Sequence, residues 1–252
     1  MALVATRLAV LIDADNASAS VTSELMAEIA KYGTPTIRRA YGDWTTQNLA
    51  GWKDHLLRHA IQPIQQFAYT RGKNATDSSL IIDAMDVLYA DNVEGFAIVS
   101  SDSDFTRLAT RLRESGKTVY GLGRRETPDA FVQACDRFIY LDLLGAEPPA
   151  KARRSDIEKL LRPAITGTAK VDGWALLSAV GSYLSASNPG FDVRDYGFSK
   201  LGELVRAQEY VEVKEVSLGS GLTQTQVRLK PRSGRNRQRS SGPVREEDRR
   251  AG

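Results

Sequence analysis

The sequence contains one cysteine, Cys135, and two histidines, His55 and His59, among 252 residues. A single cysteine excludes an intrachain disulfide and any cysteine-based metal cluster within one chain, and it is typical of a reducing cytoplasm. The two histidines lie four apart on one expected helix without an acidic ligand motif around them. A serine or cysteine hydrolase is therefore not indicated, and we expect Cys135 to belong to the core.

Long hydrophobic runs are also missing. No apolar stretch approaches the roughly 18 residues of a membrane span. The apolar N-terminal stretch leads directly into acidic residues without a cleavage-site pattern, so it does not resemble a signal peptide. We expect a cytoplasmic protein with no membrane partner, of a length that suits one large or two ordinary domains.

The charge is unevenly distributed along the chain. Residues 1–150 carry 15 Lys and Arg against 19 Asp and Glu, a net charge of −4, whereas residues 151–230 carry 12 against 9 and residues 231–252 carry 7 against 3. An acidic first part followed by two basic parts favours a metal-dependent core with appendages that bind nucleic acid. Taken alone, the small positive charge of residues 151–230 is equally consistent with an ordinary soluble surface.

Buried-strand and helix patterns alternate over residues 1–145. Apolar runs predict strands, and apolar residues at helical spacing predict helices between them. This alternation predicts an α/β fold with a mostly parallel sheet. The expected strands are residues 8–13, 35–42, 61–69, 95–100, 117–123 and 137–144, and the expected helices are residues 18–32, 46–60, 77–90, 104–115 and 128–135.

A second pattern follows a Pro-rich and charged linker at residues 146–155. Helical spacing over residues 156–166, 172–186 and 199–208, then two short strands, predicts a compact winged helix-turn-helix over residues 156–230. Arg194 and Lys200 in this part are candidates either for phosphate contacts or for a solvated face. The basic tail, residues 231–252, has a disorder-like composition.

Acidic residues follow the first expected strand. LIDADN, residues 11–16, places Asp13 at the strand end, followed by Asp15 and Asn16. The carboxyl ends of parallel strands form the crevice where open α/β sheets bind ligands. One of these residues is expected to cap the next helix, but a cap does not account for all three.

A second acidic motif is GKNATD, residues 72–77. Asn74 or Thr76 is a good helix N-cap, and Asp77 falls in the first turn of the expected helix, on the same side as its apolar residues. Asp83 and Asp86 fall on the opposite side and are expected to be solvated. Lys73 is either a surface lysine or a residue that neutralises a phosphate or the acidic cluster.

A third motif is SSDSDF, residues 100–105, directly after the strand GFAIVS. It places Asp102 at a strand end and Asp104 at the start of the next helix. Ser101 and its neighbours Ser100 and Ser103 provide hydroxyl groups and backbone N–H donors that suit a phosphate. Asp43, at another strand end, is a weaker candidate.

Asp13, Asp77, Asp102 and Asp104 are expected to meet at one edge of the sheet. Carboxylate oxygens without Cys or paired His indicate Mg²⁺ or Mn²⁺ rather than zinc. Such ions bind phosphates and assist phosphodiester cleavage. The four aspartates are thus the candidate catalytic and metal-binding residues, and the candidate substrate-binding residues are Asn16, Lys73, Thr76 and Ser101.

With these motifs in order, residues 5–145 resemble the NYN-domain proteins, a branch of the PIN-like metal-dependent ribonucleases that includes LabA-like bacterial proteins. The resemblance implies a PIN-like α/β/α sandwich, metal ligation by Asp13, Asp77, Asp102 and Asp104, and a site-organising role for Asn16. Because Asp77 and Asp102 are the expected partners of Asp13, Asp15 is left with a supporting or capping role. Residues 155–230 are similar to the LOTUS (OST-HTH) domain, an RNA-binding winged helix; the stretch from Asp172 to Val205 carries that likeness.

We therefore expect a metal-dependent endoribonuclease that binds RNA through its C-terminal domain. A non-catalytic RNA-binding regulatory protein with a nuclease-like core is the alternative. A phosphatase of the haloacid-dehalogenase kind fits poorly, because its motif requires Thr or Val where this chain has Ala17. The sequence leaves both a monomer and a homodimer open.

Overall fold

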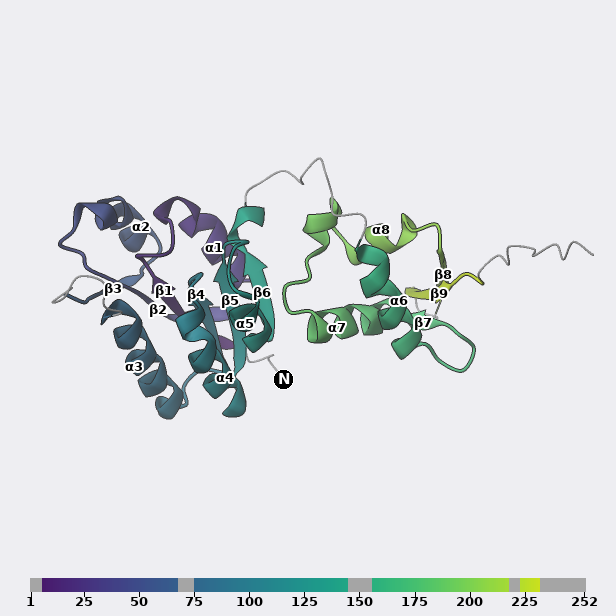
Figure 1. The fold of residues 1–252 in the computed structure, drawn as a ribbon, viewed down its shortest axis with the longest axis horizontal. Coiled ribbons are helices and arrows are strands. Elements are labelled where there is room, and N and C mark those ends of the chain that lie inside the picture. Colours follow the sequence, from purple (N-terminus) through teal and green to yellow (C-terminus); the bar gives the residue numbers. More distant parts are fainter. Residues whose placement is uncertain (1–5, 68–74, 145–155, 218–222, 232–252) are drawn as a thin grey trace, which may run out of the picture.

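The structure, a computed structural model, describes residues 6–67, 75–144, 156–217 and 223–231. Residues 6–144 form a six-stranded, all-parallel sheet with helices on both faces (Figure 1). Its strands are β1 (Arg7–Asp13), β2 (Thr34–Gly42), β3 (Gln62–Gln65), β4 (Gly95–Val99), β5 (Thr118–Gly123) and β6 (Arg137–Tyr140). Its helices are α1 (Thr22–Ile29), α2 (Lys53–Arg58), α3 (Ala75–Ala90), α4 (Thr106–Glu114) and α5 (Asp129–Ala134). The predicted α/β sandwich is confirmed.

The strand order is β3-β2-β1-β4-β5-β6. The chain starts in the middle of the sheet, runs outward to β3, and returns through α3 to β4, which pairs with β1 in parallel. The connections that leave β1 and β4 thus lead in opposite directions. In open α/β sheets this reversal opens a crevice at the carboxyl ends of the two central strands.

The two faces of β1 divide the core. Leu8, Val10 and Ile12 pack with α1, while Ala9 and Leu11 pack with residues of α3, α4 and α5. Residues 8–12 are fully buried, and burying each large aliphatic side chain stabilises the fold by roughly 1.5–3 kcal/mol. Because side chains alternate along a strand, Asp13 continues the row of Ala9 and Leu11 toward the α3 side.

Residues 156–231 form a second core around a small antiparallel sheet in the order β7-β9-β8. Its elements are α6 (Ile157–Thr168), β7 (Ala175–Leu176), α7 (Leu177–Ser187), α8 (Leu201–Arg206), β8 (Val211–Ser217) and β9 (Thr223–Leu229). Three helices and a β-ribbon agree with the predicted winged helix-turn-helix.

The predicted helix over residues 172–186 begins too early. The Asp172 carboxylate accepts a hydrogen bond from the Trp174 backbone N–H over 3.1 Å, and Gly173 has a φ of +79°, so a turn occupies this position. Ala175 and Leu176 then pair with β9 as a short strand, and the helix starts at Leu177.

The two parts of the chain meet beside β6. The Phe138 N–H donates to the Pro189 carbonyl over 2.8 Å. Arg194 binds Glu28 of α1 and Asp192 of its own domain, at 3.2 and 2.6 Å. The expectation of a solvated face for Arg194 is not met, because its guanidinium is held by these two carboxylates; a phosphate contact by Arg194 stays a prediction.

Some predictions fall outside the described residues. They concern Lys73, the linker at residues 146–155 and the basic tail beyond residue 231. Within the described ranges, none of the helices combines the length and apolar character needed to cross a bilayer.

Candidate functional site

Asp13 is the buried centre of the crevice. Its side chain has no solvent exposure, and one carboxylate oxygen accepts from the Asn16 side-chain amide over 2.7 Å and from the Ser100 hydroxyl over 2.8 Å. Burial raises the pKa of Asp13 above its usual range, and the hydrogen bonds from Asn16 and Ser100 partly oppose this effect. A carboxylate held by this many donors serves as a fixed support for the residues around it.

Ser100 joins the two central strands. It is 2% exposed, and besides donating to Asp13 its hydroxyl oxygen accepts from the Asp102 backbone N–H over 3.1 Å. The sequence interpretation selected Ser101 from the serine motif. Ser100 could have been selected because it directly follows the last residue of β4, level with the end of β1.

Asp77, Asp102 and Asp104 form a tight group that we call the acid trio. One carboxylate oxygen from each lies within 4.8 Å of the others. Asp77 comes from the first turn of α3, Asp102 caps the turn after β4, and Asp104 sits within that turn. The three predicted positions thus come together across two separate elements.

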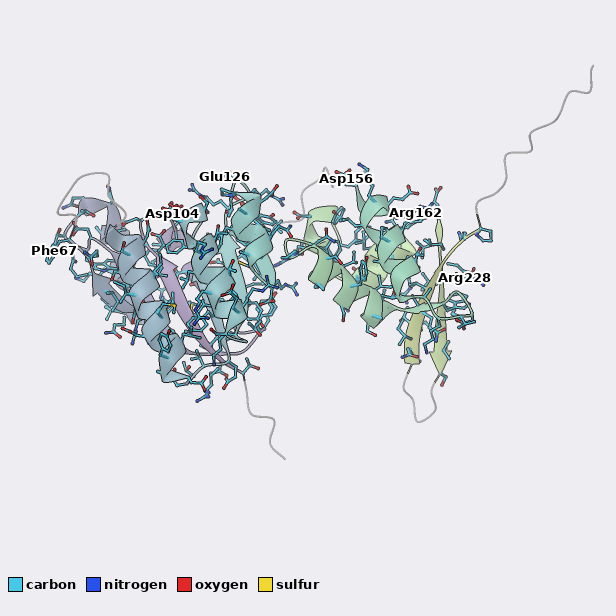
Figure 2. All side chains as sticks on the ribbon, turned by 60° about the horizontal axis from the view of Figure 1, so that its bottom comes forward. Phe67, Asp104, Glu126, Asp156, Arg162 and Arg228 are labelled. Carbon is cyan, nitrogen blue, oxygen red and sulfur yellow. The ribbon has the colours of Figure 1, made fainter. Side chains whose placement is uncertain are left out.

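Exposure increases across the acid trio. Asp77 and Asp102 are half-buried and Asp104 is exposed; in Figure 2, Asp104 lies at the upper edge of the first domain. Burial, followed by the negative charges of Asp13, Asp102 and Asp104, raises the pKa of Asp77 to about 6. Negative charge therefore accumulates here, open to solvent on one side.

Asp13 lies next to the acid trio but is not one of the carboxylates that approach within 4.8 Å of one another. Its charge is close enough to raise the pKa of Asp77. The structure therefore places three of the four predicted aspartates together. Asp13 lies next to them and is hydrogen-bonded to Asn16 and Ser100.

The other predicted residues surround this core. Asn16 contacts Asp13 through its side chain and its backbone N–H. The Thr76 hydroxyl donates to the exposed Asp15 carboxylate over 2.9 Å, which links the start of α3 to the loop after β1. The Ser101 hydroxyl accepts from the Arg124 backbone N–H over 2.9 Å, so it joins the loops after β4 and β5.

Two aspartates lie apart from the acid trio. Asp83, predicted to be solvated, instead accepts hydrogen bonds from Arg39 and from the buried Tyr41 hydroxyl. Asp43 accepts from the Thr45 hydroxyl over 2.6 Å and from the Gln65 amide over 2.9 Å. Both carboxylates serve local structure.

The donor set of the acid trio fits a divalent cation. Its members offer carboxylate oxygens, the hard ligands that Mg²⁺ and Mn²⁺ prefer. Asp77 is half-buried, and burial and its acidic neighbours raise its pKa, which means that its charged form is disfavoured. A cation placed between Asp77 and these neighbours would stabilise the charged form. Asp77, Asp102 and Asp104 are the residues that would hold it.

Sheet topology, crevice and acidic cluster together define a nuclease-like α/β domain with a small winged-helix domain after it. The family model of the NYN domain matches residues 7–142, and that of the OST-HTH/LOTUS domain matches residues 149–223. The chain therefore belongs to the NYN family and carries a C-terminal OST-HTH/LOTUS domain, a nuclease-fold protein with an RNA-related architecture.

Three solved structures are similar to parts of the chain. A protein of unknown function from Vibrio parahaemolyticus is 18% identical and aligns over 54% of this chain and 93% of its own, with a TM-score of 0.46. An uncharacterized protein from Nitrosomonas europaea is 30% identical over 34% of this chain and 84% of its own, with a TM-score of 0.30. A protein from Chromobacterium violaceum is 30% identical over 38% of this chain and 100% of its own, with a TM-score of 0.27. No curated protein matches the chain.

Proposed function

We propose that the protein is a Mg²⁺- or Mn²⁺-dependent endoribonuclease that hydrolyses RNA phosphodiester bonds, with the acid trio as its metal site. The observation that carries the proposal is the approach of Asp77, Asp102 and Asp104 to within 4.8 Å at the switch point of an NYN domain. A bound divalent cation supplies Lewis-acid stabilisation of the charge that develops on the phosphate oxygens during hydrolysis.

The residues of the chain provide the support for this chemistry. The Ser100 hydroxyl donates a hydrogen bond to the Asp13 carboxylate and accepts one from the Asp102 backbone N–H, so the turn that carries Asp102 and Asp104 is anchored on β1. Thr76, through Asp15, anchors the turn of α3 that carries Asp77. Such anchoring keeps ligands in one geometry, which lowers the cost of ordering them when a substrate arrives. Asp104, exposed, is the member that meets the approaching RNA strand.

RNA binding is assigned to the second domain, on the strength of its OST-HTH/LOTUS family match. The domain division at residues 1–145, 146–155, 156–230 and 231–252 stays a prediction, as does nucleic-acid binding by the basic tail. The choice between a monomer and a homodimer stays open. A cytoplasmic location also stays a prediction, made from the single cysteine.

The test is RNA cleavage by the purified full chain with Mn²⁺, on single-stranded and structured RNAs. Wild type is expected to cleave, and Asp77→Asn is expected to lose at least about 100-fold in rate because a ligand of the acid trio becomes neutral. Asp86→Asn is the matched control, since it makes the same change on the same helix outside the acid trio.

Two outcomes contradict the proposal. One is intact RNA after incubation with wild type. The other is equal cleavage by wild type and Asp77→Asn, which would trace the activity to a contaminating nuclease. RNA binding without cleavage in all three proteins would favour the non-catalytic alternative.

A further inference from the structure

We propose that Arg124 binds a phosphate of the RNA strand at the rim of the acid trio and so places the strand over the metal site. This inference rests on the proposed function for its substrate class. It identifies a binding residue on the loop after β5, which none of the sequence motifs includes.

Sheet register puts Arg124 beside the acid trio. β5 pairs with β4 in parallel, with Leu122 opposite Val99, so the residues that follow the two strands leave the sheet at the same level. The Arg124 N–H donates to Ser101 over 2.9 Å, one residue before Asp102. In Figure 2, Glu126 of this loop and Asp104 lie along the same upper edge of the domain.

The backbone of this loop is closely held. A Cβ atom on Gly123 would lie 2.5 Å from the Ser100 carbonyl oxygen. The chain after β5 therefore lies so close to the chain after β4 that only glycine fits at this position. The buried Thr127 hydroxyl donates to the Arg124 carbonyl over 2.6 Å. The Arg125 N–H donates to Asp142 over 2.9 Å. A fixed backbone beside Ser101 gives the Arg124 side chain a defined starting point.

The Arg124 guanidinium is available for a new partner. Its side chain is 51% exposed, and its ion pair with Glu126 measures 3.3 Å with Glu126 65% exposed. Exposed ion pairs contribute little to stability, so a phosphate can replace the Glu126 carboxylate. A guanidinium suits this role because it binds two phosphate oxygens at once.

The negative charge of the site favours a positively charged side chain at this rim. The acid trio and its neighbours Asp13 and Asp15 repel RNA phosphates, and an adjacent arginine offsets that repulsion. The neighbouring Arg125 cannot serve, because its guanidinium is bound to Asp195 of the second domain and lies over the Tyr140 ring. The same loop therefore contacts the second domain through the Arg125 side chain and contacts the loop of the acid trio through the Arg124 backbone.

The experiment compares wild type, Arg124→Ala, Arg124→Lys and the control Arg111→Ala. Arg111 is an exposed arginine in the last turn of α4, bound to Ser115, away from the acid trio. Binding of a short fluorescein-labelled single-stranded RNA is measured by anisotropy in EDTA at several salt concentrations. Cleavage of the same RNA is measured with Mn²⁺.

For Arg124→Ala we expect about fivefold to tenfold weaker binding and a salt-dependence slope smaller by about one. KM should rise by a similar factor with kcat little changed, as for the loss of a contact made equally in the ground and transition states. Arg124→Lys should restore the salt-dependence slope because it restores the charge, but only part of the affinity, because an ammonium group does not bind two phosphate oxygens at once. Arg111→Ala should behave like wild type.

The outcomes separate the two proposals. If wild type cleaves RNA and Arg124→Ala matches Arg111→Ala in affinity, slope and KM, the role of Arg124 is wrong and the nuclease function stands. If wild type binds without cleaving and Arg124→Ala weakens binding, the function is wrong and the phosphate contact stands. If wild type neither binds nor cleaves RNA, both are wrong.

Discussion

The Ser100 hydroxyl donates a hydrogen bond to the Asp13 carboxylate over 2.8 Å, and both residues are buried. This bond joins the ends of β1 and β4, the two strands between which the sheet reverses its direction of growth. Because Ser100 also accepts the Asp102 N–H, the bond connects the buried Asp13 to the acid trio.

Replacing Ser100 with Ala is expected to lower the free energy of unfolding by about 1–3 kcal/mol, because a buried carboxylate then loses one of its donors. Urea denaturation of Ser100→Ala and wild type measures this difference. Ser103→Ala is the control, since Ser103 lies exposed in the same loop. Equal stability of Ser100→Ala and Ser103→Ala would show that the bond to Asp13 contributes little.

Removing the charge of Asp77 is expected to change how stability depends on pH. Its pKa is raised to about 6, first by burial and then by neighbouring carboxylates, above the ordinary value of about 3.9. A raised carboxyl pKa means that the folded state binds the proton more tightly. The contribution of protonated Asp77 to the stability of the folded state is fully present below about pH 4 and is lost as the pH rises through about 6.

In metal-free buffer Asp77→Asn should therefore be more stable than wild type near pH 7, and the difference should shrink as the pH falls toward 4. Urea denaturation across this pH range measures it. Adding Mn²⁺ at pH 7 should stabilise wild type and not the variant, because only wild type keeps the complete acid trio. A difference that is independent of pH, or that grows at low pH, would contradict the assigned charge state.

Replacing Arg194 with Ala is expected to weaken the contact between the two domains. Arg194 spans Glu28, whose side chain is 6% exposed, and Asp192, 8% exposed. The variant leaves Asp192 without its cation and Glu28 with Lys31 alone. We expect a loss of about 1–2 kcal/mol and a larger radius of gyration in solution scattering. The control is Arg206→Ala, which removes an exposed pair within the second domain; an unchanged radius for Arg194→Ala would refute the interdomain role.

The sequence predicted the parts of the fold that follow from local patterns. Buried strands such as residues 95–99 appear as short apolar runs, and the helix of Asp77 has regular apolar spacing. The strand β7 was missed because two residues are too few to show alternation, and its pairing partner β9 lies about fifty residues further along the chain.

The site was predictable as far as it depends on strand and helix ends. Asp77, Asp102 and Asp104 were found this way, and they do meet. Asp83 was assigned wrongly because a helical projection considers only the helix itself, whereas Arg39 and Tyr41 reach Asp83 from β2. The loop of Arg124 was missed because its relevance depends on β5 lying beside β4, which is a tertiary fact.

The central claim is that the acid trio binds a divalent cation. Titration of metal-free protein with Mn²⁺ by calorimetry, on wild type, Asp102→Asn and the control Asp86→Asn, tests it most directly. We predict saturable binding to wild type and to Asp86→Asn, and an affinity at least about tenfold lower for Asp102→Asn, because one of the carboxylate ligands is neutral. Equal Mn²⁺ affinity for wild type and Asp102→Asn would contradict the account.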